Sequence, residues 1–239
     1  MGTSACKMAI ECLEKIYEMY NNRILCMLIF GSRSDGRHRE GSDTDILIIF
    51  KDNVPVDDVL SSLDVCLSER NIVYDCGWYR ISDLKSMIEK GEDWFILYNI
   101  LKSGVMVCGD KKLLSELREQ VSRIDAIKAI RETLRSRLRR NIALKHAMAR
   151  NLRTLLLNVA LLDFIRLKGY IPSYSELLCW VLSADSTLNA AEKEILLNTI
   201  RIIKARKDVC LSAIEVIEQM VIKRCVSVMA SIRSQEQSK

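Results

Sequence analysis

The sequence predicts a small mixed α/β (α+β) domain over residues 1–121, followed by an all-helical bundle over residues 122–239. Three observations predict this division. Of the nine glycines only Gly169 lies beyond Gly109, so tight turns are concentrated in the first half. Short apolar runs bounded by turn residues also occur in that half. Charge divides in the same way, because residues 1–110 carry 12 Lys and Arg against 18 Asp and Glu, whereas residues 111–239 carry 24 against 13.

Three strands are predicted in the first part. Residues 24–30 (ILCMLIF) and 45–50 (DILIIF) are short, continuously apolar runs, which are typical of strands buried on both faces. Residues 71–80 are rich in β-forming side chains and alternate in polarity. Residues 103–110 are expected to add a short extended segment at the edge of the sheet. The order of these strands and the helices between them predicts one sheet covered by helices.

Helices are predicted where apolar residues recur every three or four positions, or where a capping residue precedes such a run. In the first part they are residues 5–21, a helix that starts at Pro55 with Asp57 and Asp58 in its first turn, one from Ser82 or Asp83 to Lys90, one from Asp93 to Lys102, and residues 111–121. In the second part they are Ile124 to the region of Gly169, with an interruption near residues 145–151, Ser173 to Leu182, Ser186 or Thr187 to Ala205, and Asp208 to Ser231.

The polar residues between the first two strands carry the candidate chemistry. Gly31 and Ser32 follow a buried strand, where a glycine admits close approach to a ligand and backbone and hydroxyl donors can hold an anion. Asp43 and Asp45 are two residues apart at the start of the next strand, so their carboxylates are expected to lie side by side. Adjacent carboxylates repel each other unless a cation lies between them, and Mg²⁺ suits such a pair together with substrate phosphate.

A third carboxylate, Asp75, lies in the otherwise apolar third strand, where an unpaired charge is costly. If this strand neighbours the strand of Asp43 and Asp45, all three could hold the two ions of a two-metal site. The alternative reading is structural: Asp43 caps a turn, Asp45 is solvated and Asp75 sits at an edge.

At these residues the sequence resembles the DNA polymerase beta-like nucleotidyltransferase superfamily, whose signature is Gly-Ser, about ten residues, Asp-x-Asp and a later strand with a third aspartate. Gly31, Ser32, Asp43 and Asp45 match directly, Ser42 completes the Ser-Asp-x-Asp variant and Asp75 takes the third position, although Cys76 and Gly77 after it are less typical. The resemblance extends to about residue 121. It implies transfer of a nucleoside monophosphate, usually from ATP with Mg²⁺ (Mn²⁺ is an alternative), to a hydroxyl, with Gly31 and Ser32 on the triphosphate and Asp43, Asp45 and Asp75 on the metals.

Several partners remain open at this stage. The acceptor of the nucleotide is a small molecule, an RNA end or a protein side chain, as for minimal nucleotidyltransferase antitoxins. Alternatives are a non-catalytic nucleotide-binding or antitoxin-like regulatory protein, and a nucleic-acid-binding module. A homo-oligomer is also possible. Arg37 is a candidate phosphate ligand in the loop before Asp43, ahead of Arg33 and Arg39, and His38 is read as a surface residue.

The second part begins with a strongly basic stretch, from Lys128 to Arg153. Ile127, Ile130, Leu134 and Leu138 are predicted to form its buried stripe, and Arg131, Arg135 and Arg139 a cationic ridge, either for a polyanion or simply solvated. Arg140 and His146 loosely resemble the ribonuclease motif of HEPN helical domains. In its layout this part resembles more closely the substrate-binding bundles of kanamycin-type nucleotidyltransferases.

Composition excludes several classes. The apolar runs are too short for a membrane span, and the acidic, amphipathic N-terminus is unlike a signal peptide, so a cytoplasmic location is expected. The nine cysteines form no CxxC pair and there are only two histidines, so a zinc site is not expected. We expect buried thiols in a reducing compartment, with a pair such as Cys6 and Cys12 as the alternative that bridges.

Overall fold

The computed structural model describes residues 4–33, 43–138, 145–205 and 221–230. The chain divides into two compact units: residues 1–89 with 96–123, and residues 90–95 with 124–239. Each unit is described by itself below. The predicted fold class is confirmed, since a mixed four-stranded sheet with helices is followed by a mostly helical region.

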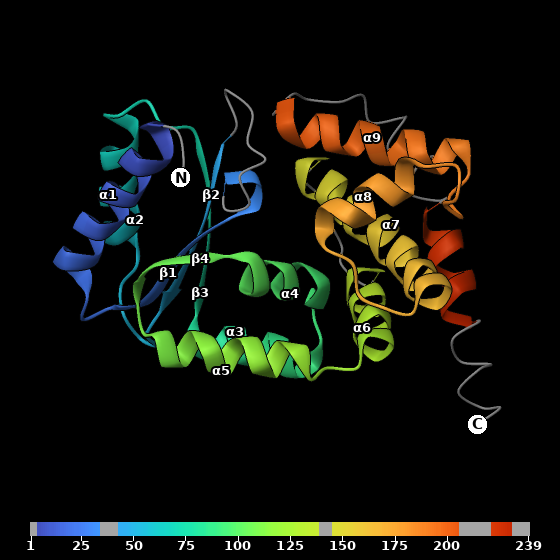
Figure 1. Cartoon of the computed structure of the whole chain (residues 1–239), viewed down its shortest axis with the longest axis horizontal. Coiled ribbons are helices and arrows are strands. Elements are labelled where there is room, and N and C mark those ends of the chain that lie inside the picture. The colour runs from blue at the N-terminus through green and yellow to red at the C-terminus, as the bar shows by residue number, and fades with distance from the viewer. Residues whose placement is uncertain (1–3, 34–42, 139–144, 206–220, 231–239) are drawn as a thin grey trace. The chain divides into compact units, whose positions relative to one another are not determined.

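The first unit is built on a four-stranded sheet with the order β3-β2-β1-β4 (Figure 1). The central strands β1 (Ile24–Phe30) and β2 (Thr44–Phe50) are antiparallel, β4 (Val105–Gly109) pairs antiparallel with β1, and β3 (Tyr74–Arg80) pairs parallel with β2. The predicted edge segment is thus confirmed as the strand β4. A short 3₁₀ turn, η1 (Gly31–Arg33), follows β1.

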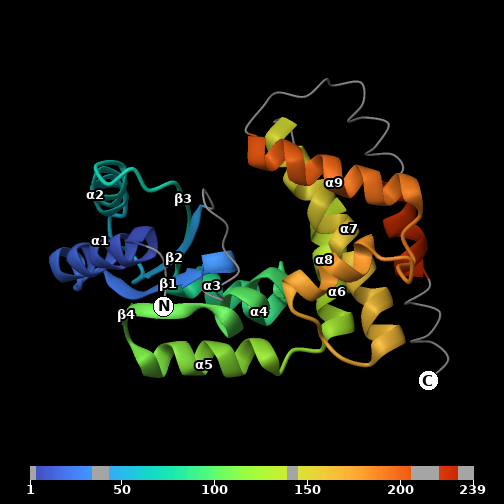
Figure 2. The ribbon, with the colours of Figure 1, turned by 45° about the horizontal axis from the view of Figure 1, so that its top comes forward.

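Five helices cover this sheet, and the views in Figures 1 and 2 place α1 and α2 on one side and α3, α4 and α5 on the other. Ile46, Ile48 and Phe50 of β2 point toward α1 and α2 and form a buried core with residues such as Leu13 and Leu63. The helices of this layer and of the opposite one are α1 (Ser4–Tyr20), α2 (Asp57–Ser68), α3 (Ile81–Lys90), α4 (Trp94–Ser103) and α5 (Lys111–Ser122).

The start of α3 differs from the prediction. The helix begins at Ile81, directly after β3 ends at Arg80, so neither Ser82 nor Asp83 caps it. Ser82 instead donates two hydrogen bonds to Asp52 Oδ1, from its backbone nitrogen (3.1 Å) and its hydroxyl (2.7 Å). Asp52, which is 30 positions away in the sequence, therefore accepts the hydrogen bond from the first turn of α3 that the sequence pattern assigned to a local cap.

Helices joined by turns and loops make up the described residues of the second unit. It contains α6 (Ala126–Leu138), α7 (Lys145–Lys168), α8 (Tyr174–Leu182), α9 (Ala190–Ala205) and helical residues 221–230. Ser173 caps α8 through a capping box with Glu176, and Gly169, with φ of +79°, ends α7, both as predicted. Among the described residues, none of the helices has the length and apolar content needed to cross a bilayer.

Three details of the second unit correct the predictions. The helix α7 runs unbroken through residues 145–151, where an interruption was predicted, and residues 139–144 before it lie outside the described residues. The helix α9 starts three or four residues later than expected, because Asn189 caps it by accepting from Glu192 N at 2.9 Å. In α6 the buried side chains are Ala129, Ile130, Thr133 and Leu134, whereas Ile127 is 38% exposed and Leu138 only half-buried.

The segment 90–95 belongs to the helical unit because it is held to α6. Arg137 Nε donates to Asp93 Oδ1 at 2.8 Å and Arg137 Nη2 donates to Asp93 Oδ2, while Thr133 Oγ1 donates to the Gly91 carbonyl at 3.1 Å. The side chains of Arg137 and Asp93 are only 15% and 12% exposed. An ion pair joined by two hydrogen bonds fixes the position of one side chain relative to the other. Because the pair is nearly buried, loss of one partner leaves the other with an uncompensated buried charge.

We expect Asp93→Asn to destabilise the helical unit by about 3 kcal/mol, because Arg137 would keep a buried charge without a counter-charge. Asn suits the positive φ of 48° at this position, so the backbone is not disturbed. The matched control is Glu119→Gln, which removes the partner of Arg123 in an ion pair whose side chains are 60% and 75% exposed, and should cost less than about 1 kcal/mol. Urea unfolding followed by circular dichroism measures both. Equal shifts in the two variants would contradict the assignment.

Candidate active site at the edge of β2 and β3

The pairing of β2 with β3 brings two of the predicted carboxylates together. Asp45 of β2 lies directly opposite Asp75 of β3 in a parallel register, and Thr44 lies opposite Tyr74. Residues paired in this way project from the same face of a sheet and belong to strands about 4.8 Å apart. The backbone of Asp43 continues into this ladder, because Thr44 N donates to the Val73 carbonyl at 2.9 Å.

The residues from 43 to 45 alternate between the two faces of the sheet. Asp43 is exposed and Asp45 half-buried, whereas Thr44 between them is fully buried on the face covered by α1 and α2. Asp75 is exposed on the same face as Asp45. Asp45 and Asp75 therefore share one face and one end of the sheet, and Asp43 directly precedes β2 at that end.

Gly31 lies directly beneath the carboxylate of Asp45. Phe30, the last residue of β1, is paired with Asp45 across the sheet, and Gly31 follows it with φ of +73°. A Cβ atom added to Gly31 would overlap Asp45 Oδ2. Both the backbone conformation and the close approach of the carboxylate therefore require glycine here.

Tyr74 and Asp64 secure the start of β3. The Tyr74 hydroxyl donates to Asp64 Oδ1 of α2 at 2.7 Å, on the opposite face of the sheet from Asp75. Burial raises the pKa of Tyr74 to about 12, with a smaller contribution from the Asp64 carboxylate, so the phenol remains a donor at neutral pH. The sequence carried no local signal for this contact, because it joins a strand to a helix that precedes it.

The donor set fits a hard divalent cation in its chemistry, since Asp43, Asp45 and Asp75 offer oxygen ligands on one face. The three carboxylates do not converge on a common point. Within the described residues, no three His, Cys, Asp or Glu side chains form a cluster that could hold a metal. The strand register fixes the backbones, so convergence on an ion would require changes in side-chain torsions.

Other predicted site residues lie outside the part of the chain that the structure describes. These are Ser42 and Arg37, together with His38 and Arg39 of the same loop, Arg139 and Arg140. The side chains of Arg33 and His146 also fall outside it, so the resemblance of Arg140 and His146 to a ribonuclease motif remains a prediction. Ser32 is described within η1 and is half-buried, next to Gly31.

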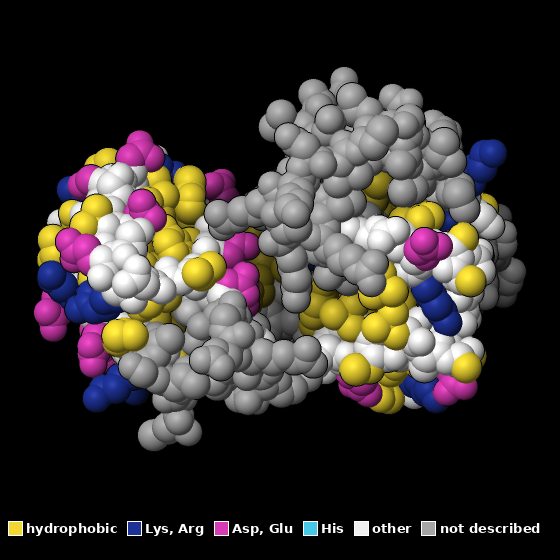
Figure 3. All heavy atoms as spheres, turned by 90° about the horizontal axis from the view of Figure 1, so that it is seen from above, with side chains coloured by type: hydrophobic (Ala, Val, Ile, Leu, Met, Phe, Trp, Pro, Cys, Tyr) yellow, Lys and Arg dark blue, Asp and Glu magenta, His cyan; other side chains and the backbone are white. Residues whose placement is uncertain are grey.

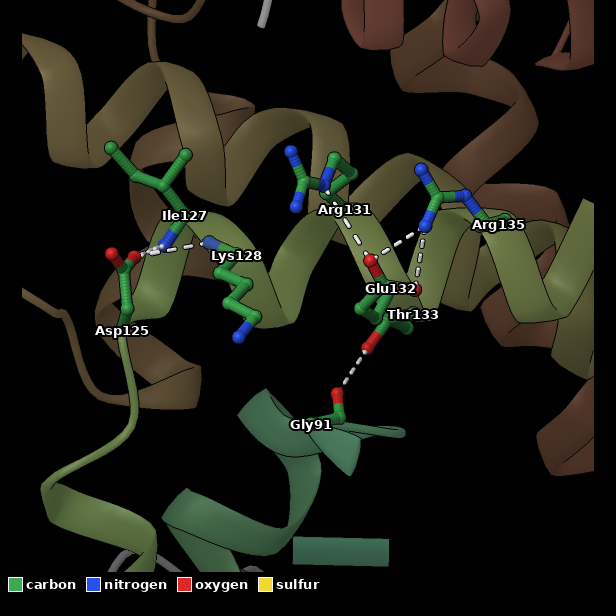
Figure 4. Close-up of polar contacts among 8 residues, drawn as sticks. All are labelled: Gly91, Asp125, Ile127, Lys128, Arg131, Glu132, Thr133 and Arg135. Atoms are coloured by element: carbon green, nitrogen blue, oxygen red, sulfur yellow. Dashed lines mark hydrogen bonds and ion pairs between the residues drawn. The ribbon is translucent and has the colours of Figure 1, made fainter. Parts of the chain in front are cut away.

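The basic stretch of α6 is more neutralised than its composition suggested. Figure 4 shows Arg131 and Arg135 on either side of Glu132, with separations from Glu132 Oε1 of 3.5 Å for Arg131 Nε and 2.7 Å for Arg135 Nη1. Arg137 is paired with Asp93. Arg131 and Arg135 share the one carboxylate of Glu132, so only part of the charge of the predicted cationic ridge is offset by acidic partners. On the face that Figure 3 shows, acidic side chains are spread over the described surface of the N-terminal unit.

Comparison with known protein families agrees with this geometry. Residues 11–113 match the family model "Polymerase beta, Nucleotidyltransferase", a segment that contains Gly31, Asp43, Asp45 and Asp75. This part of the chain belongs to the polymerase beta-like nucleotidyltransferase superfamily. No curated protein matches the chain in sequence.

One solved structure shows a similar fold over most of the chain. A spectinomycin adenyltransferase, AAD(9) from Enterococcus faecialis, solved with ATP and spectinomycin, superposes with a TM-score of 0.52 at 15% identity, covering 91% of this chain and 98% of that one. A toxin–antitoxin structure with AMP-PNP has a TM-score of 0.40 at 16% identity, and an MntA–HpeT mutant 0.39 at 15%; each covers 54% of this chain and 97% of the other.

Replacing Gly31 by alanine is expected to destabilise the first unit, the nucleotidyltransferase unit, by about 2–4 kcal/mol. Alanine is strained at this φ, and its methyl group would displace the Asp45 carboxylate. Gly169→Ala is the matched control, because Gly169 has a similar φ of +79° but nothing within 4 Å of the added Cβ. That variant should show only the backbone cost of about 1 kcal/mol. Chemical denaturation compares the two. If Gly31→Ala cost no more than Gly169→Ala, the close packing of Asp45 on Gly31 would be wrong.

Proposed function

We propose that the protein transfers a nucleoside monophosphate, AMP from ATP, to a hydroxyl group of an acceptor. The observation that carries this proposal is the register that sets Asp45 opposite Asp75, with Gly31 beneath Asp45, in the segment that belongs to the nucleotidyltransferase superfamily. The similar structure of an adenyltransferase, solved with ATP and spectinomycin, supports AMP as the transferred group.

The three carboxylates have distinct proposed roles. Asp43 and Asp45 would hold a divalent cation, Mg²⁺ or Mn²⁺, and Asp75 would complete its site. When bound, the cation neutralises charge on the triphosphate and on the leaving pyrophosphate. Asp75 is exposed, and its carboxylate would take the proton of the acceptor hydroxyl.

Phosphate binding is assigned to the turn after β1. Gly31, with its positive φ and no side chain, lets the Asp45 carboxylate pack against the turn, and Ser32 offers a hydroxyl and a backbone N–H for the triphosphate. Ser42 and Arg37 are proposed to complete this phosphate site. An arginine would offset phosphate charge that the cation leaves uncompensated.

The acceptor is proposed to be selected by the helical region, residues 122–239. Its class, a small molecule, an RNA end or a protein side chain, is the open part of the proposal. The internal pairing of Arg131, Arg135 and Arg137 argues against an acceptor held mainly by these charges, since each already faces a carboxylate.

Binding of ATP is expected to tighten at least tenfold when Mg²⁺ is added to the wild-type protein, because the cation joins the carboxylates to the triphosphate. In the double variant Asp43→Asn/Asp45→Asn, adding Mg²⁺ should change ATP affinity less than about threefold, since both anionic ligands are lost. Isothermal titration calorimetry with a non-hydrolysable ATP analogue measures the effect. Asp57→Asn, which removes an exposed carboxylate from the first turn of α2, is the matched control and should behave as wild type.

Transfer is tested separately with ATP labelled at the α-phosphate, incubated with small-molecule, RNA and protein fractions. Label should appear in one fraction, and Asp75→Asn should lower its rate by about 100-fold or more while Mg²⁺-dependent ATP binding is largely kept. Tight Mg²⁺-dependent binding with no transfer to any fraction would favour a non-catalytic, nucleotide-binding regulator. Mg²⁺-dependent ATP binding that survives in the double variant would defeat the site assignment.

A further inference from the structure

Two cysteines and an arginine form a compact cluster between α1 and α2. Cys12 Sγ and Cys66 Sγ are 2.7 Å apart, and Cys12 Sγ also donates to the Cys66 carbonyl oxygen at 3.1 Å. The two sulfur atoms are therefore only slightly further apart than the roughly 2.05 Å of a disulfide bond. Both cysteines are free thiols, and Cys12 is fully buried whereas Cys66 is 6% exposed.

Arg70 binds both sulfur atoms at once. Its Nη1 atom donates to Cys12 Sγ and to Cys66 Sγ, at 2.8 Å each, and lies 3.3 Å from the Cys66 carbonyl oxygen. The arginine lies just beyond the end of α2, where its backbone N–H bonds to the Leu67 carbonyl. Burial, together with the neighbouring Cys66, raises the pKa of the Cys12 thiol to about 12, and the Arg70 guanidinium opposes this rise.

We propose that Cys12 and Cys66 are a redox-modification site that forms a reversible intramolecular disulfide. The oxidant is a peroxide, and a dithiol reverses the reaction. The Cys66 sulfur, the more exposed of the two, loses its proton and attacks a peroxide oxygen; the O–O bond breaks, and the leaving hydroxide takes up a proton to give water and a sulfenic acid on Cys66. The Cys12 sulfur then attacks the Cys66 sulfur, the S–O bond breaks and a second water leaves. Two electrons pass from the two thiols to one hydrogen peroxide, which gives two waters in all.

The site is separate from the proposed catalytic face. Cys12 and Cys66 belong to the core on the α1 and α2 side of the sheet, whereas Asp45 and Asp75 lie on the opposite face. The inference does not rest on the nucleotidyltransferase activity, and its test needs no substrate. The bond would link residues 54 positions apart and so enclose β1, η1, β2 and most of α2 in one loop.

Other described cysteines lack this arrangement. Cys26 and Cys225 are fully buried, and burial raises the pKa of each thiol to about 12, as it does for Cys12, so the pKa does not set them apart. In the part of the chain that the structure describes, no second sulfur lies within hydrogen-bonding distance of either one. The pairing of Cys12 with Cys66 also replaces the sequence-based alternative of Cys6 with Cys12.

Tryptic peptide mapping tests the proposal directly. Cleavage after Lys7, Lys15, Lys51 and Arg70 gives peptides 8–15 and 52–70, each of which contains a single cysteine. After treatment of the reduced, folded, full-length protein with hydrogen peroxide, we expect these two peptides to be joined, with the loss of two hydrogens, and to separate again after dithiothreitol. We also expect oxidation to raise the thermal midpoint by at least about 5 °C, because the bond closes a long loop in the unfolded chain.

Three variants keep the result interpretable. Cys66→Ser should abolish both the joined peptide and the thermal shift, whereas Cys225→Ser, which removes a buried thiol elsewhere, should keep both. Arg70→Lys retains a positive charge but loses the guanidinium fork, and should slow formation of the bond by about tenfold at neutral pH. Circular dichroism verifies that each variant is folded. Absence of the joined peptide in folded, oxidised wild type, or a thermal shift that persists in Cys66→Ser, would overturn the inference.

Discussion

The alignment of β2 between β1 and β3 is the constraint on which the nucleotidyltransferase unit depends. One register places Phe30 opposite Asp45 and Asp45 opposite Asp75, and so determines which side chains meet at the candidate site. The same register directs Ile46, Ile48 and Phe50 into the core beneath α1 and α2. Hydrophobic burial on one face thereby fixes the positions of charged groups on the other, because alternate residues of a strand cannot be moved independently.

Much of this unit could be predicted because its signals are local. The continuous apolar runs of β1 and β2, the glycine at position 31 and the paired aspartates at 43 and 45 are all visible within about 25 residues of sequence. Asp75 required one further inference, that its strand neighbours β2, and the parallel pairing confirms it. The convergence of the three side chains on metal stays a prediction, since it depends on side-chain torsions and a bound ion.

The features that sequence reasoning missed join residues far apart in the chain. Arg137 donates to Asp93, which is 44 positions away in the sequence. The basic helix α6 therefore has a second acidic partner besides Glu132. Cys12 finds Cys66 across 54 positions, where spacing alone suggested Cys6. Ser82 bonds to Asp52 instead of capping its own helix. Periodicity and capping rules describe neighbours along the chain, whereas these contacts are set by how whole elements pack.

The alternation at residues 43–45 also bears on how the sheet assembles. Thr44 is buried between two acidic neighbours that face the other way. If the register of β2 shifted by one residue, the carboxylates of Asp43 and Asp45 would be buried in the hydrophobic core under α1 and α2. Thr44 would then lie on the exposed face. Burying two unpaired anions is far less favourable than burying one hydroxyl. Asp43 and Asp45 therefore disfavour the register of β2 that is shifted by one residue, independently of any role in nucleotide binding.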